Sequence, residues 1–240
     1  MPIEPMYEGH DLEVLCALPR YYGWIYDYFE PHLNGHGAEF GPGLGTNSAR
    51  ILLKLVTLDL IEPSPNLVSK LQERFASDKR VRIIASGIEG FVETSPDNIY
   101  DTIVLINVLE HVHDDVAAVQ SFYRLLRPGG HLLLFVPAVP ILFSRLDKLL
   151  GHYRRYSLVR LTQIITKANF EIRVGRYFDA LGVFPWFLIN TLGRATRFNP
   201  YLAWMYDTAG VPLTRMLESL MPPLFGKNIC LVAQKPNPSP

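Results

Sequence analysis

The sequence of 240 residues has no excess of charge and very few cysteines. Lys and Arg together number 23, as do Asp and Glu, so the chain lacks the basic surface that favours nucleic-acid binding. Its two cysteines, Cys16 and Cys230, are too few for a disulfide framework and form no CxxC pair. We therefore expect two buried thiols in a reducing compartment, with the protein in the cytoplasm and no nucleic-acid partner.

Long hydrophobic runs are missing as well. No stretch reaches the roughly 18 uncharged apolar residues that a membrane-spanning helix requires. The longest candidates, residues 131–143 and 180–193, are shorter and contain proline. Residues 1–14 are acidic without an apolar centre, so we predict no signal peptide.

Apolar strand-like runs alternate with segments of helical spacing along most of the chain. Such alternation predicts an α/β fold with a doubly wound sheet. Helices are expected between the runs, including one or two over residues 12–33 and one over 114–130 that Pro128 and two glycines end. Seven runs are predicted to be strands: 37–41, 56–63, 81–86, 100–111, 131–137, 171–178 and 228–235.

One segment does not fit the simple alternation. Residues 179–225 are rich in aromatic and aliphatic side chains and are predicted to form two or three helices inserted before the last strand. They indicate an apolar cover over a lipophilic acceptor, a membrane-surface or dimer contact, or helices that simply pack on the sheet edge. We divide the single domain into N-terminal helices (1–36), a core (37–178 and 226–235) and this helical insertion.

A glycine-rich loop follows the first predicted strand. Its pattern is Glu39-x-Gly41-x-Gly43-x-Gly45, with Thr46 or Asn47 available as the N-cap of the next helix. A loop between a strand and a helix is where open α/β sheets bind nucleotides. No lysine follows, so the loop is not a phosphate-binding Walker loop, and the glycine register disfavours a nicotinamide-dependent oxidoreductase.

The acidic residue and the alternating glycines resemble motif I of the class I S-adenosylmethionine-dependent methyltransferases. Residues 83–91 resemble the adenine-binding loop of that class. Residues 100–114 followed by 125–137 resemble the "FD…VLEHV…LKPGG" block of the type 11/12 methyltransferase families. These motifs occur in the family's order, so the resemblance implies a Rossmann-like seven-stranded sheet whose last strand is antiparallel, with S-adenosylmethionine as the cofactor.

A carboxylate at the end of the second strand suits a ribose diol, because it accepts both hydroxyl protons. Glu62 stands there, and Asp59, inside the strand, is its competitor; a carboxylate at that position needs a polar neighbour. The N-terminal aromatics are expected near the cofactor's methionine moiety, since its sulfonium favours an aromatic ring. The resemblance and these arguments imply the following cofactor-binding residues: Glu39, Gly41, Gly43, Gly45, Glu62, Ser86, Gly87, Ile88, Asn107, Tyr21 and Trp24. Glu89 is a further candidate at the adenine loop.

Catalysis by in-line methyl transfer needs positioning and, for a protonated nucleophile, a base. His152 is the preferred base and His111 the second choice, although His111 also fits a packed residue at a helix start. Residues 113–115 look like a solvated helix start. Tyr153, Arg154 and Arg155 are candidates for binding an acceptor anion, and the two arginines are equally compatible with pairing to Asp147 and other acids.

A metal site is not predicted. Some related quinone O-methyltransferases carry a "SEVxEHV" block that is thought to use a divalent ion. Here Asn107 replaces the first carboxylate, which leaves Glu110 and His111 as a thin ligand set for magnesium.

The leading hypothesis is therefore a methyltransferase acting on a small, lipophilic or lipid- or sugar-pathway acceptor. We expect a monomer or homodimer with peripheral membrane contact as an option. The alternative hypotheses are a catalytically inactive methyltransferase-like protein that only binds the cofactor and the oxidoreductase disfavoured above.

Overall fold

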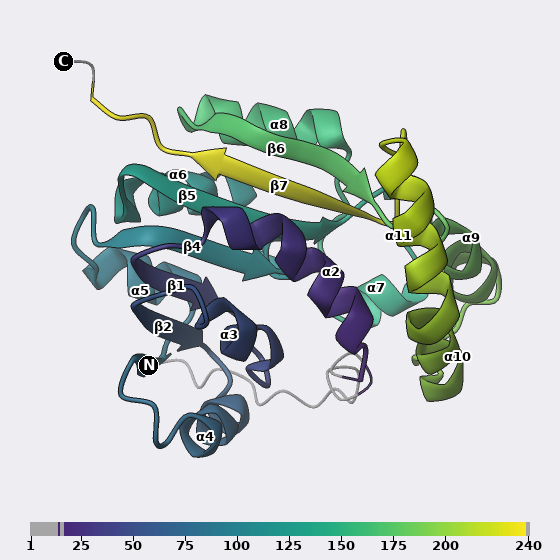
Figure 1. The fold of residues 1–240 in the computed structure, drawn as a ribbon, viewed down its shortest axis with the longest axis horizontal. Coiled ribbons are helices and arrows are strands. Elements are labelled where there is room, and N and C mark those ends of the chain that lie inside the picture. Colours follow the sequence, from purple (N-terminus) through teal and green to yellow (C-terminus); the bar gives the residue numbers. More distant parts are fainter. Residues whose placement is uncertain (1–13, 15–16, 239–240) are drawn as a thin grey trace.

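The computed structural model describes Val14 and residues 17–238. Its centre is one seven-stranded sheet with the order β3-β2-β1-β4-β5-β7-β6 (Figure 1). Strand β7 runs antiparallel to β5 and β6, and the remaining paired strands are parallel. The predicted doubly wound sheet with an antiparallel last strand is confirmed. The strands are β1 (His36–Phe40), β2 (Thr57–Glu62), β3 (Val81–Ala85), β4 (Tyr100–Ile106), β5 (Leu126–Pro137), β6 (Glu171–Phe178) and β7 (Asn228–Gln234).

Helices cover both faces of the sheet. On one face α2 (Pro19–Phe29), α3 (Thr46–Ile51) and α4 (Pro65–Arg74) bury a cluster that includes Trp24, Leu60 and Phe135. On the other face α5 (Ile88–Thr94), α6 (Asp115–Leu125) and α8 (Leu158–Lys167) bury a cluster around Phe40 and Phe122. Two buried faces explain why the central strands are apolar along their whole length.

The remaining helical segments follow strand ends or fill the insertion. Short turns η1 (Glu30–His32), η2 (Leu109–His111) and η3 (Pro140–Leu142) connect elements, and α7 (Arg145–Leu149) precedes α8. Between β6 and β7 come α9 (Val183–Trp186), η4 (Phe187–Leu192), α10 (Pro200–Met205), η5 (Tyr206–Gly210) and α11 (Val211–Leu220). We call residues 183–220 the cap helices.

Two predicted helix boundaries are wrong. The helix expected over 114–130 ends at Leu125, and Arg127–Gly130 belong to β5. The N–H of Gly129 donates to the Lys235 carbonyl (2.8 Å) and the Lys235 N–H donates to the Gly130 carbonyl (2.9 Å), a pairing with distant residues that local sequence does not reveal. The helix after the glycine loop has Gly45 as its N-cap, so Thr46 and Asn47 lie inside it.

The cap helices lie at the edge of the sheet where the parallel strands end, beside α2 and α7 (Figure 1). They are tied to α2 by Asp207 of η5, whose carboxylate accepts from the backbone N–H groups of Arg20 (3.3 Å) and Tyr21 (2.8 Å). That carboxylate therefore caps the first turn of α2 from another part of the chain. Among the residues described, no helix is both long enough and apolar enough to cross a membrane.

The cysteine prediction is tested for one of the two residues. Cys230 is a free, fully buried thiol in β7, and burial raises its pKa to about 12. Cys16 lies outside the described residues.

Candidate active site

The glycine-rich loop joins the end of β1 to the start of α3. Gly41, Gly43 and Gly45 all have positive φ (63°, 57° and 72°), a conformation that side-chain-bearing residues rarely adopt. A Cβ on Gly41 would lie 2.6 Å from Val108. Gly41 is thus required for packing, and the positive φ of Gly43 favours glycine there too.

Glu39 lies just before this loop and is almost completely buried. Its carboxylate accepts a hydrogen bond from the Ser48 hydroxyl (2.5 Å). Burial raises the pKa of Glu39 to about 7, with the nearby Glu62 adding to the shift. The side chain therefore links β1 to α3 beneath the loop and favours a cationic neighbour that would keep it ionised.

Glu62, the last residue of β2, binds the backbone of the glycine loop. One carboxylate oxygen accepts from the Gly43 N–H (3.2 Å) and the other from the Ser64 N–H (3.0 Å). Its competitor Asp59 binds the Arg82 guanidinium and the Tyr100 hydroxyl, and so has the polar neighbours that the sequence analysis required. Glu62 is the carboxylate at the loop.

The expected adenine-binding residues lie at the ends of neighbouring strands. Ser86 follows β3, and its N–H donates to the Glu62 carbonyl (3.2 Å). Gly87 is the N-cap of α5, and Ile88 begins that helix with Glu89 in its first turn. Asn107 follows β4 with φ 54°, and its N–H donates to the Phe135 carbonyl (2.8 Å). Because parallel strands end at one edge, these residues share the edge that carries the glycine loop.

The two N-terminal aromatics have different surroundings. The Trp24 indole lies in the core, 3.9 Å between ring centroids from Phe178. The Tyr21 hydroxyl donates to the Asn228 side chain (2.9 Å), and the Lys227 ammonium lies 4.8 Å from the Tyr21 ring. Tyr21 is therefore the one that lies beside polar groups at the sheet edge, whereas Trp24 has a packing role.

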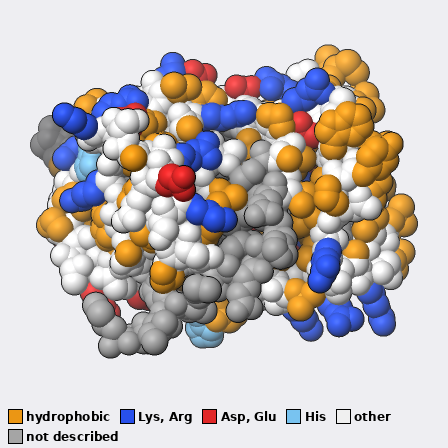
Figure 2. Space-filling model, turned by 90° about the horizontal axis from the view of Figure 1, so that it is seen from below, with side chains coloured by type: hydrophobic (Ala, Val, Ile, Leu, Met, Phe, Trp, Pro, Cys, Tyr) orange, Lys and Arg blue, Asp and Glu red, His pale blue; other side chains and the backbone are white. Residues whose placement is uncertain are grey.

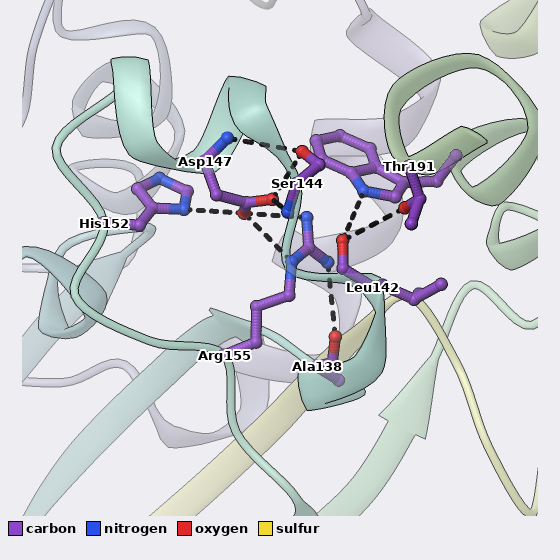
Figure 3. A network of polar contacts seen from close by, with 8 residues as sticks. Ala138, Leu142, Ser144, Asp147, His152, Arg155 and Thr191 are labelled. Atoms are coloured by element: carbon purple, nitrogen blue, oxygen red, sulfur yellow. Dashed lines mark hydrogen bonds and ion pairs between the residues drawn. The ribbon is translucent and has the colours of Figure 1, made fainter. Parts of the chain in front are cut away.

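A buried ionic network organises the loop that contains α7 (Figure 3). Ser144 and Asp147 form a capping box at the start of α7. The Asp147 carboxylate also binds the Arg155 guanidinium (2.9 Å) and Nδ1 of His152 (3.0 Å). Burial would raise the pKa of Asp147, but His152, Arg155 and Ser144 together lower it to about 2.

Both arginines of this loop are engaged by acids, as one of the two interpretations predicted. Arg155 also donates to the Ala138 carbonyl (3.2 Å) and lies 4.4 Å from the Trp186 ring, and it is 6% exposed. Arg154 pairs with Asp115 (2.9 Å) and donates to the His113 carbonyl (2.7 Å). Asp115 is buried at 3% exposure, so the solvated helix start predicted there is wrong for this residue.

The α7 loop brings His152 next to the turn η2. The ring centroids of His152 and His111 lie 4.7 Å apart, at 89° to each other. Glu110, between His111 and Leu109, is fully buried, and burial raises its pKa to about 8. From the sequence, Glu110 and His111 were a ligand pair too small for magnesium, and the fold adds His152 as the third member of this cluster.

A pocket of about 420 Å³ lies between α2 and the cap helices. Its walls are mostly apolar, and a few polar groups, among them Tyr21, Asn190 and Lys227, line it too. Tyr21 thus belongs both to the pocket and to the expected cofactor surroundings. A pocket that is largely apolar with a few polar groups has the character of a small-molecule site.

A family model described as a methyltransferase domain matches residues 18–173, which carry this edge of the sheet and its loops. The chain belongs to this methyltransferase domain family. The class I S-adenosylmethionine-dependent methyltransferase recognised in the motifs is thereby confirmed as the family.

Curated relatives match over part of their length. A probable S-adenosylmethionine-dependent methyltransferase from Mycolicibacterium smegmatis is 34% identical over 91 residues, which are 37% of this chain and 34% of that protein. A ubiquinone/menaquinone biosynthesis C-methyltransferase from Cronobacter sakazakii is 35% identical over 72 residues, 30% of this chain and 28% of that protein. The chain thus spans about a third or less of these relatives.

Solved structures match over nearly the whole chain. An S-adenosylmethionine-dependent methyltransferase from Mesorhizobium loti has a TM-score of 0.63 and 12% identity, covering 90% of this chain and 97% of that one. An N-methyltransferase from Bradyrhizobium japonicum, solved with S-adenosyl-L-homocysteine, has a TM-score of 0.60 and 16% identity, covering 97% and 94%. At these identities the match shows a shared fold.

Proposed function

We propose that this protein is an S-adenosylmethionine-dependent methyltransferase that binds its cofactor along the carboxyl edge of β1, β2, β3 and β4. The observation that carries this proposal is the glycine loop, whose three glycines have positive φ and which Glu62 braces through the Gly43 N–H. S-adenosylmethionine supplies an electrophilic methyl group on a sulfonium. The protein's own task is to position donor and acceptor, and orientation alone is worth roughly 7–11 kcal/mol of barrier.

The residues at this edge suit the parts of the cofactor. Glu62 has the charge to accept hydrogen bonds from a ribose diol in addition to those of the loop. The Gly43 backbone lies where a ligand can approach closely, and Ser86, Gly87 and Ile88 lie where adenine would be recognised by polar and backbone groups. Tyr21 would present a ring toward the sulfonium.

The acceptor that we propose is lipophilic and reaches the site through the apolar pocket under the cap helices. This pocket lies between α2 and residues of α9, α10 and η5, and it shares Tyr21 with the expected cofactor site. Its walls offer few hydrogen-bonding groups, so a strongly polar acceptor would lose hydration without replacing it.

The outer surface of the insertion favours delivery of that acceptor from a membrane surface. Of the 22 large hydrophobic side chains exposed among the described residues, 16 lie between Phe184 and Phe225. Hydrophobic side chains crowd the right-hand side of Figure 2, where the cap helices lie, with Lys and Arg at its edge. The insertion's acids, Asp179, Asp207 and Glu218, are buried, whereas Arg194 is exposed. An apolar face with only basic surface charge suits an anionic lipid surface.

Calorimetric titration tests the cofactor assignment. The full chain should bind S-adenosylmethionine and S-adenosylhomocysteine and should not bind NADH. An exposed carboxylate on α4, Glu73, provides the matched control, because Glu73→Ala should leave both affinities unchanged. Failure to bind S-adenosylmethionine at millimolar concentration would refute the proposal. Binding without methyl transfer to any lipid extract would favour the cofactor-binding scaffold instead.

A further inference from the structure

The cluster at the end of β4 contains a carboxylate that the fold leaves without a partner. Glu110 is 0% exposed, and neither of its carboxylate oxygens has a hydrogen-bond partner among the described residues. A buried carboxyl without a hydrogen bond is costly even with the Arg155 charge nearby, so Glu110 is a candidate for binding a ligand.

Two imidazoles face this carboxylate. Each of Glu110, His111 and His152 offers one ligand atom, and these atoms all lie within 4.8 Å of one another. The two rings meet edge to face, with their centroids 4.7 Å apart. From the sequence alone, one carboxylate and one imidazole are expected here. The second imidazole, His152, comes from a loop 41 positions after His111, which local sequence could not place.

The backbone holds the two parts of the cluster together. The Tyr153 N–H donates to the Glu110 carbonyl (2.8 Å), and the His152 N–H donates to the Asp147 carbonyl (2.9 Å). Gly151, with φ 78°, provides the left-handed residue that reverses the chain after α7. The Tyr153–Glu110 bond therefore fixes the chain after α7 against η2 through the backbone, and the His152–Asp147 bond shapes the α7 loop itself.

His152 is oriented as metal-ligating histidines usually are. It uses Nδ1 to bind the Asp147 carboxylate (3.0 Å), which leaves Nε2 as the nitrogen for a metal. Asp147 is itself fixed by Arg155 and Ser144. Such a carboxylate–histidine pair fixes the ring and its tautomer for coordination through the other nitrogen.

We propose that Glu110, His111 and His152 bind a divalent transition-metal ion such as Zn²⁺. Two imidazoles and one carboxylate are a ligand set for zinc and its neighbours, whereas Mg²⁺ and Ca²⁺ prefer oxygen ligands. Three protein ligands leave a coordination position open to an oxygen of the acceptor, a role that rests on the function proposed above. This assignment replaces the general-base role that the sequence analysis gave to His152 and His111, since a nitrogen that binds a cation accepts no proton.

Metal titration of the tag-free, chelator-treated full chain tests the site. Wild type should bind one equivalent of Zn²⁺ by calorimetry, and Co²⁺ should give the visible absorption bands of a low-coordinate ion. Mg²⁺ should bind far more weakly. Glu110→Gln and His111→Ala should each weaken Zn²⁺ binding at least about tenfold, since even outer-shell changes cost that much.

The control is His113→Ala, which removes an exposed histidine two positions from His111. It should bind Zn²⁺ within about twofold of wild type. His152→Ala could also disturb Asp147, so its result is read only alongside a melting curve. The proposal is overturned if wild type binds Zn²⁺ no more tightly than Glu110→Gln, or if His113→Ala loses as much affinity as His111→Ala. Because no S-adenosylmethionine is present, this outcome is independent of the cofactor titration that tests the proposed function.

Discussion

Replacing Glu62 with alanine separates what this carboxylate does for the fold from what it does for the cofactor. Its oxygens accept the Gly43 and Ser64 N–H groups, so the variant leaves two backbone donors without their acceptor. Hydrogen bonds to a charged group contribute about 1.5–3 kcal/mol each, and water entering the space recovers part of that. We expect the free energy of unfolding to fall by about 2–3 kcal/mol.

The same variant should weaken S-adenosylmethionine binding by about 1–3 kcal/mol, which is roughly 5- to 150-fold in Kd. Two effects add here: the lost hydrogen bonds to the ribose and the loss of a preformed glycine loop. The measurements are calorimetric titration with S-adenosylmethionine and urea unfolding without ligand.

Asp59→Asn is the matched control, because Asp59 lies on the same strand but pairs with Arg82 and Tyr100. It should lose about 1–2 kcal/mol of stability and keep the wild-type Kd. If Glu62→Ala binds S-adenosylmethionine within twofold of wild type, Glu62 is not the ribose ligand and the placement of the cofactor is wrong.

Four further outcomes follow from the described contacts. Burial alone would raise the pKa of Asp59, but hydrogen bonds from His36, Arg82 and Tyr100 lower it to about 2. Ionised Asp59 should therefore stabilise the fold by about 1–2 kcal/mol above pH 4, a figure discounted for the exposed Arg82, and this stabilisation should be lost toward pH 2. Unfolding of Asp59→Asn and wild type across this pH range measures it. The pH dependence is opposite for Glu39, because burial raises its pKa to about 7. The free energy of unfolding of wild type should fall by up to about 3 kcal/mol relative to Glu39→Gln as the pH rises from 4.5 through 7. Equal pH dependence of the two proteins would contradict the burial argument. Arg155→Ala should cost about 3–5 kcal/mol in urea unfolding because it leaves Asp147 buried without its cation, and a loss below 1 kcal/mol would mean that solvent already reaches this pair. Trp204→Glu, at a side chain 56% exposed on α10, should reduce sedimentation with anionic lipid vesicles several-fold, whereas Leu53→Glu, 73% exposed on the far side of the core, should not.

Local sequence was sufficient wherever the chemistry is carried by neighbouring residues. The alternating apolar runs predicted the seven strands because both sheet faces are buried, and the glycine spacing predicted the loop because only glycine adopts its backbone angles without strain. Glu62 could be placed at the end of the second strand by counting residues onward from the glycine loop. Motif order then identified the family, which the match over residues 18–173 confirms.

Tertiary structure decided everything that depends on residues far apart in the chain. Arg127–Gly130 form a strand because Lys235, far along the chain, pairs with them. The first turn of α2 is capped by Asp207, which lies 186 positions after Tyr21 in the sequence. The two arginines of the α7 loop had two compatible interpretations until Asp147 and Asp115 were found against them.

The sharpest difference concerns Glu110. As a sequence, Leu109-Glu110-His111 offered a motif with too few ligands for a metal. Burial removed the carboxylate from water, and the α7 loop brought His152 beside it, through a turn that depends on Gly151. Sequence alone determined the family and most strands, because those follow from motif order, local periodicity and spacing. Which side chains face one another across that edge was decided only by the folded chain, because side-chain convergence depends on long-range packing.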